Sequence, residues 1–208
     1  MKPSASYPKL ATLVLATSAV VMLSGCGAML AQNPSSSFTP VNAVAAEPES
    51  RLLLKGADVV AYFTQGQYVQ GSPEFRSQHQ GVDFRFASAE HKALFDQNPA
   101  QYLPQYGGYC ANGIVYGIPW GGDADTWKMI DGKLYIFGGK ASQEAFELDT
   151  AANIALAQRY WDGEVKGSNS FIQRGKRLVF KVPHYQSGEQ LAQAVAAAKA
   201  TGAAPTKP

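Results

Sequence analysis

The sequence predicts an α+β fold in which small antiparallel β-hairpins pack with short helices, as a single domain that ends in a C-terminal helix. Apolar and polar residues alternate along Val82–Phe86, as in a strand with one buried face. The dipeptide Asp131-Gly132 joins two apolar segments, which is a strong signal for a type I′ hairpin turn. Ser187 and Gln190 have the spacing of a capping box ahead of a helical apolar stripe.

The remaining elements are predicted from caps and short apolar runs. Ser88 is a favourable N-cap, and the helix that it begins should end near Asn98 because Pro99 follows. The apolar runs over residues 59–63 and 177–182 each predict a short strand. Two further helices are expected to be capped by Ser142 and Thr150.

The N-terminus has the charge and hydrophobicity pattern of a secretory signal. Two lysines precede a mostly apolar run over residues 10–23, which is shorter than the roughly 20 residues of a membrane span. The run ends in Leu-Ser-Gly-Cys, which resembles the bacterial lipobox. The resemblance implies that residues 1–25 are a lipoprotein signal peptide. It also implies that Cys26 carries the lipid, which includes a palmitate chain. The alternative is an ordinary cleavable signal that contains this motif by chance.

The resemblance to lipoproteins also predicts a location and an organisation. Gly27, rather than Asp, follows the cysteine, which favours the outer membrane facing the periplasm. Residues 26–50 are poor in sustained apolar periodicity and are expected to be a disordered tether. We expect a domain over residues 51–165, a strand and helix extension over 166–200, and a disordered tail over 201–208.

Charge and cysteine content restrict the partners. The formal net charge of +2 comes from the two lysines of the signal, so the chain from Cys26 onward is formally neutral. Without a basic cluster, nucleic acid is not expected as a partner, and the expected membrane contact is the lipid anchor. Acylation of Cys26 would leave Cys110 as the one free thiol, so no internal disulfide is expected.

Several linked motifs in the middle of the chain resemble the YHS domain. They comprise residues 59–63, 71–75, 84–88 and 106–110, with Trp127 and residues 131–135 resembling the larger secreted subgroup. The resemblance covers most of residues 52–190. It implies a small hairpin-and-helix module similar to treble-clef metal-binding domains.

The resemblance also carries an expectation about metal ligands. Metal-binding YHS relatives have cysteines in the first turn and just before the helix, where thiolates close a tetrahedral site. This chain has Val60 and Ala61 in the first turn and Ala87 before the helix, so His91 is the one potential ligand left there. A closed zinc site is therefore not expected.

The candidate ligand site is the turn that contains Tyr109 and Cys110. Two glycines precede it and would let the backbone approach a ligand closely. Cys110 would supply a soft donor for a transition metal, with copper favoured and His91 as a second donor. The alternative is that Cys110 is a small buried core residue beside Tyr109, and that His91 lies exposed on its helix.

No catalytic motif is present: the sequence has no serine nucleophile elbow, HExxH, phosphate loop or CxxC. The carboxylates Asp123 and Asp125 lie near Trp120 and Trp127, a combination found in sugar-processing sites, but turn formation also explains them.

The sequence therefore predicts a non-enzymatic, lipid-anchored envelope protein that binds a transition metal or a small ligand near Cys110. The alternative is a non-catalytic interaction or scaffold module that docks an envelope partner through its aromatic surface and C-terminal helix. An enzyme acting on envelope material is a third hypothesis.

Overall fold

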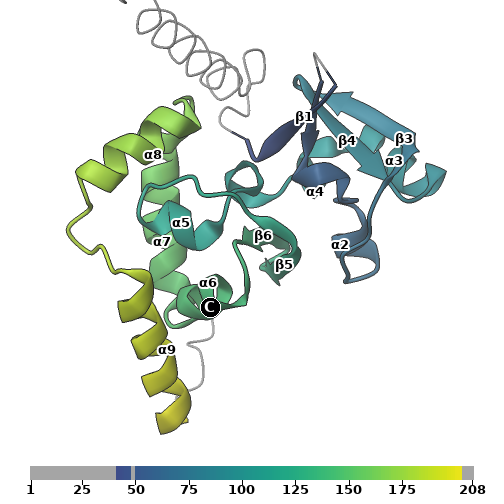
Figure 1. Ribbon diagram of the computed structural model, residues 1–208. Helices are drawn as coiled ribbons and strands as arrows, with labels where there is room; N and C mark the ends of the chain where they lie inside the picture. The colour runs from purple at the N-terminus through teal and green to yellow at the C-terminus, as the bar shows by residue number, and fades with distance from the viewer. Residues whose placement is uncertain (1–40, 48–49, 203–208) are drawn as a thin grey trace, which may run out of the picture.

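The computed structural model describes residues 41–47 and 50–202 and has the expected α+β architecture (Figure 1). Roughly half of these residues are helical, and the strands form a mixed sheet and a separate two-stranded hairpin. The predictions for the signal peptide, for Cys26 and for the tail beyond Gly202 lie outside the described residues.

The mixed sheet has the strand order β1-β2-β4-β3. It comprises β1 (Ala43–Glu47), β2 (Ser50–Leu53), β3 (Ser72–His79) and β4 (Val82–Phe86). The predicted β4 is confirmed, because its three apolar side chains are buried and alternate with half-buried polar ones. The parallel pairing of β2 with β4 was not predicted, since the sequence indicated antiparallel hairpins alone.

The segment between the sheet strands β2 and β3 corrects one predicted element. Residues 59–63 do not form a strand: they enter the short helix α2 (Ala61–Thr64), which follows the 3₁₀ turn η1 (Leu54–Gly56). The physical reason is Asp58, whose carboxylate accepts hydrogen bonds from the N–H groups of Val60 and Ala61 and so begins a helical turn.

The second hairpin, β5 (Asp123–Ile130) and β6 (Lys133–Phe137), confirms the predicted turn. Asp131 and Gly132 have φ values of 48° and 70°, as a type I′ turn requires. Strand β6 is buried on both faces. Leu134 and Ile136 belong to the hydrophobic cluster around the mixed sheet, whereas Tyr135 and Phe137 belong to the cluster around the C-terminal helices. This hairpin therefore joins the two halves of the core.

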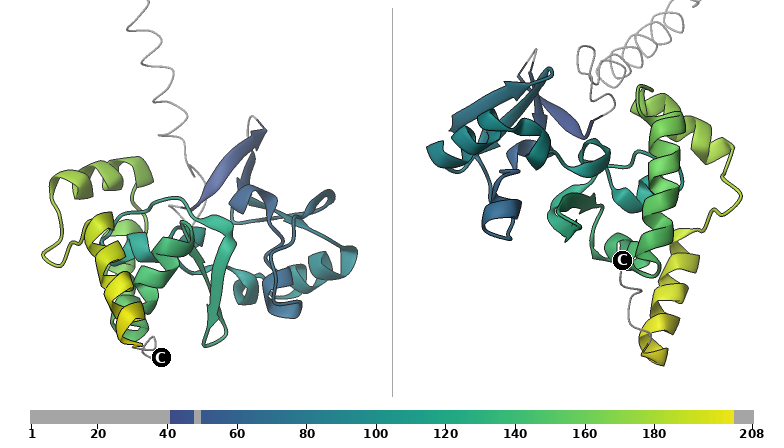
Figure 2. Two further views of the ribbon diagram at one scale, coloured as in Figure 1. Left: turned by 60° about the horizontal axis from the view of Figure 1, so that its bottom comes forward. Right: turned by 180° about the vertical axis from the view of Figure 1, so that it is seen from behind.

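The later helices lie on one side of this hairpin, and the earlier ones lie with the mixed sheet on the other side (Figures 1 and 2). Ser88 caps the helix that follows it, as predicted, with its hydroxyl accepting from His91 N–H at 3.2 Å. Two other caps were misplaced by one to three residues: the N-caps are Gly139 and Asp149. The helical elements are α3 (Ala89–Gln97), α4 (Pro99–Tyr102), η2 (Gln105–Gly108), α5 (Ala111–Val115), α6 (Lys140–Glu147), α7 (Thr150–Tyr160), the π-helix η3 (Trp161–Val165), α8 (Ser170–Val179) and α9 (Gly188–Thr201).

The expected limits of the domain need two corrections. Residues assigned to the tether belong to the fold, because Val41 is buried and Asn42 donates from its amide to the carbonyls of Gly108 and Gly122, each at 3.0 Å. The boundary expected at Val165 falls inside one hydrophobic cluster.

The C-terminal extension is helical where a strand was expected. Residues 177–179 belong to α8, because the Asn169 side chain caps that helix by accepting from Phe171 and Ile172 N–H at 3.0 and 3.2 Å. The capping box of Ser187 and Gln190 is present at the start of α9, as predicted.

Candidate functional site

A buried carboxylate and imidazole connect the first turn of the fold to α3. Asp58 is fully buried and His91 is only 8% exposed. One carboxylate oxygen of Asp58 holds the α2 turn, while the other accepts from Ala87 N–H at 2.7 Å and lies 2.6 Å from His91 Nδ1. His91 is therefore not the exposed helix residue that one interpretation expected. The pair clamps the α2 turn to the start of α3.

The second ring nitrogen of His91 is also engaged. Nε2 lies 3.2 Å from Thr64 Oγ1 and 3.3 Å from Gln65 Nε2. The Thr64 hydroxyl in turn donates to the carbonyl of Val60 at 3.1 Å. Both nitrogens thus have protein partners, which favours a structural role for this histidine.

Cys110 is a buried residue at the N-cap of the short helix α5, with 4% of its surface exposed. Its Sγ lies 3.0 Å from the hydroxyl oxygen of Ser142 on α6. The preceding turn depends on left-handed backbone at Tyr106, Gly107 and Gly108. The thiol therefore lies just inside the molecular surface, next to one hydroxyl.

Tyr109 is an anchor of the fold and not an open ligand position. Its hydroxyl donates to the carbonyl of Val41 at 2.8 Å. Burial raises the pKa of this phenol to about 12, and a hydrogen bond with the Ser170 side chain and the charge of Arg174 act in the opposite direction. The side chain thus ties the beginning of the described chain to α8.

The two proposed copper donors do not converge. The contacts of Cys110 and those of His91 share no residue, and α5 and α3 lie in separate parts of the fold (Figures 1 and 2). Within the described ranges, no group of three or more His, Cys, Asp or Glu side chains is arranged to hold a metal ion. The residues present therefore do not fit a metal centre built on Cys110 and His91.

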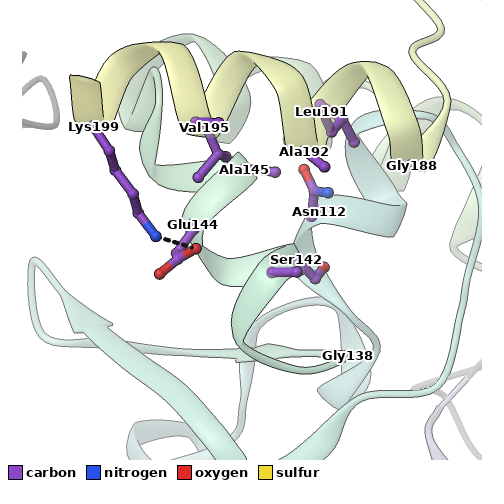
Figure 3. A pocket seen from close by; sticks show the side chains of 12 residues that line it. Asn112, Gly138, Ser142, Glu144, Ala145, Gly188, Leu191, Ala192, Val195 and Lys199 are labelled. Carbon is purple, nitrogen blue, oxygen red and sulfur yellow. Dashed lines mark ion pairs between the residues drawn. The ribbon is translucent and has the colours of Figure 1, made fainter. Parts of the chain in front are cut away.

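A groove of about 550 Å³ lies beside Cys110, between α6 and α9 (Figure 3). Ser142 lines this groove and also contacts the thiol, so Cys110 lies directly behind the groove wall. The surface of the groove is mainly aliphatic. Its lining comprises Asn112, Gly138, Ala141, Ser142, Glu144, Ala145, Gly188, Leu191, Ala192, Val195, Ala196 and Lys199.

Asn112 is the polar group that distinguishes this groove from a simple gap between helices. The residue is only 8% exposed, and its carboxamide points from α5 towards α9 (Figure 3). No other side chain or backbone group of the described chain bonds to this carboxamide. Its nitrogen and oxygen are not among the fully buried side-chain atoms that lack a partner, so they face the groove, where water or a bound molecule can hydrogen-bond to them.

The charges at the groove compensate each other. Lys199 and Glu144 form an ion pair with 2.9 Å between nitrogen and oxygen, and both line the groove (Figure 3). Because the remaining lining residues are neutral, the groove has no uncompensated charge. Its chemistry suits a ligand with an apolar body and one neutral hydrogen-bonding group.

The acidic pair considered from the sequence lies elsewhere. Asp123 and Asp125 are exposed on β5 and line a second, polar hollow of about 310 Å³ with Lys55. Asp125 accepts from its neighbour Thr126 at 3.3 Å. Within this hollow the pair has no feature that indicates a role in catalysis.

The sequence did not indicate Asn112 as a site residue, and it singled out Ser142 only as an expected helix cap. Asn112 and Ser142 are 30 positions apart, and neither belongs to a recognisable motif. The one local signal was the glycine-rich turn before Cys110, a residue that contacts Ser142 of the groove wall. Asp58 was likewise overlooked, although an Asp immediately before an apolar run is a plausible turn cap.

Comparison of the chain with protein-family models, with curated proteins and with solved structures finds no significant match. Among the helices of the described residues, none combines the length and the apolar character needed to cross a membrane.

Proposed function

We propose that this chain is a non-enzymatic, lipid-anchored, YHS-like protein of the bacterial envelope that binds a small, mainly apolar ligand between α6 and α9. The observation that carries the proposal is the carboxamide of Asn112, which faces an aliphatic groove and bonds to no other group of the described residues. A groove of about 550 Å³ is within the range of small-molecule sites.

The lining defines the chemical class of the ligand. Leu191, Val195 and the surrounding alanines favour an aliphatic body. The Asn112 carboxamide can donate and accept hydrogen bonds, which favours a neutral amide or another group with both functions. The compensated charges of Glu144 and Lys199 give no preference for an ion. A fatty amide has this combination of features.

The family and the anchor are part of the same proposal and have separate support. The lipobox-like motif at Cys26 supports the anchor and the outer-membrane location facing the periplasm. Metal-binding YHS relatives have cysteines near the positions of Ala61 and Ala87. In this chain the backbone N–H groups of these two residues donate to the carboxylate of Asp58. A hydrogen-bonded carboxylate would thus replace a metal at the place where the family binds one.

Two alternatives have less support from the geometry. Copper binding would rest on Cys110 alone, since His91 is engaged with Asp58. The interaction-module hypothesis is favoured by one specific observation, the exposed apolar residues of α8, although these lie on a different helix from the groove.

A displacement titration tests the groove. The full chain would be saturated with the neutral fluorescent probe N-phenyl-1-naphthylamine, and dodecanamide would be added as competitor. We expect Asn112→Leu to weaken dodecanamide about tenfold, because one buried hydrogen bond contributes roughly 1 to 1.5 kcal/mol. Ala192→Phe fills the groove from an exposed position and should abolish binding of both compounds.

Ala197→Phe is the matched control, because Ala197 is an exposed alanine of the same helix that does not line the groove. It should bind like the parent. If the parent shows no saturable binding, or if Ala192→Phe and Ala197→Phe behave alike, the groove is not a ligand site. Copper retained by the purified chain and lost on Cys110→Ala would instead restore the metal hypothesis.

A further inference from the structure

Helix α8 exposes its apolar face to solvent. Phe171, Ile172, Leu178 and Val179 recur at the spacing i, i+1, i+7 and i+8, which places them on one stripe of the helix. All four side chains are exposed, Ile172 by 61% and Val179 by 73%, and the exposed Phe180 follows the helix. A helix of a globular domain normally turns such a stripe towards the core.

The polar face of α8 is the one that packs on the protein. Gln173 is buried and donates to the carbonyl of Gly117 at 3.0 Å. Arg177 pairs with Glu164, donates to Phe180 O at 3.1 Å, and places its guanidinium 5.5 Å from the centre of the Tyr160 ring. These contacts fix the rotation of the helix, so the apolar stripe cannot turn inward without breaking them.

The charged residues of this segment are all basic. Residues 170–182 contain Arg174, Lys176, Arg177 and Lys181 and no acidic residue. Because Lys176 and Arg177 pair with Glu164 of η3, the positive charge beside the stripe comes mainly from Arg174 and Lys181. Arg174 also lies 6.0 Å from the centre of the half-exposed indole ring of Trp120. Apolar residues flanked by basic side chains and a tryptophan form the pattern of helices that lie in the interface of an anionic bilayer.

The position of α8 agrees with such a contact. Tyr109 bonds both to Val41, where the described chain begins, and to Ser170, the first residue of α8. Figure 1 shows β1 and α8 at the same end of the molecule. Fourteen residues separate Cys26 from Val41, which limits the distance from a lipid at Cys26 to about 50 Å.

We infer that the stripe of α8 is a membrane-contact surface that inserts into the headgroup region of an anionic bilayer and orients the domain on it. The inference goes beyond the groove and is independent of its ligand. It uses the proposed anchor only for the distance argument, since the exposed stripe and its basic flanks would bind a bilayer without any acyl chain.

Vesicle flotation tests the inference without the contribution of the anchor. The chain from residue 26 onward with Cys26→Ser retains every described residue and carries no lipid. We expect it to float with vesicles of phosphatidylethanolamine and phosphatidylglycerol, and at least tenfold less with phosphatidylcholine vesicles. Raising the salt from about 0.05 to 0.5 M should weaken flotation, because exposed charges are screened.

The double variant Ile172→Glu/Val179→Glu should lose at least tenfold in vesicle binding and keep the circular dichroism and thermal midpoint of the parent, because both side chains are already exposed. Leu94→Glu, an exposed apolar residue on α3, is the matched control and should bind like the parent. The inference is overturned if the parent does not float, if both variants bind equally, or if light scattering shows a dimer that the double variant dissociates. None of these results depends on ligand binding in the groove, so the two proposals can fail separately.

Discussion

The sharpest stability prediction concerns Asp58, a fully buried carboxylate with four hydrogen-bonding partners. Asp58→Ala would leave the N–H groups of Val60 and Ala87 and Nδ1 of His91 without the carboxylate, whereas Ala61 N–H keeps the Asp58 backbone carbonyl at 3.2 Å. Val60 precedes α2 and Ala87 precedes α3, so one substitution loosens both elements.

The magnitude follows from the burial. Removing one partner of a buried polar pair costs about 3–5 kcal/mol, and a hydrogen bond to a charged group contributes about 1.5–3 kcal/mol. Because such terms are not additive, we expect Asp58→Ala to lower the free energy of unfolding by about 3–5 kcal/mol. Asp58→Asn keeps one acceptor oxygen and should cost about half as much.

Urea denaturation followed by tryptophan fluorescence measures both variants. The control is Asp96→Ala on α3, whose half-exposed carboxylate pairs with Lys92 at 2.5 Å and should cost less than about 1 kcal/mol. A loss of under about 1 kcal/mol for Asp58→Ala, or a loss no greater than that of the control, would refute the clamp between α2 and α3.

Two further predictions concern Glu164 and Cys110. Although burial opposes it, hydrogen bonds from Lys176, Arg177 and Gln173 lower the pKa of Glu164 below its ordinary 4.5. A lowered folded-state pKa means that this contact stabilises the fold above the unfolded-state pKa and is lost as the pH falls through the folded one. In urea titrations the free energy of unfolding of the parent should exceed that of Glu164→Gln at pH 6, and this difference should become smaller below about pH 4. A difference that stays constant with pH would contradict the prediction. The buried thiol of Cys110 should react with Ellman's reagent at least 100-fold more slowly in the native chain than in urea, and comparable rates would show that it is accessible.

Local signals predicted part of the fold well. The Asp131-Gly132 turn, the strand Val82–Phe86 and the cap at Ser88 were all confirmed, because each depends on a few neighbouring residues. Short apolar runs were less reliable. The run over residues 177–182 has the composition of a strand, but Asn169 begins a helix ahead of it. Periodicity alone cannot separate the two in so short a segment.

The candidate site was predicted only as a neighbourhood. Cys110 lies next to Ser142, which lines the groove, but its expected partner His91 contacts Asp58, which is 33 residues away from His91 in sequence. Asn112 and Ser142 line the same groove because α6 packs against both α5 and α9. No sequence motif indicates this packing.

The sequence by itself determined the alternating strand Val82–Phe86, the turn at Asp131-Gly132 and the capping box of the last helix, since these depend on backbone preferences within a few residues. The tertiary structure decided which side chains share a site and which face of α8 meets solvent. An amphipathic pattern reveals that a helix has an apolar face, but the direction of that face depends on what the polar face can bond. For α8 those bonds come from Gly117 and Glu164, which only the folded chain brings to Gln173 and Arg177.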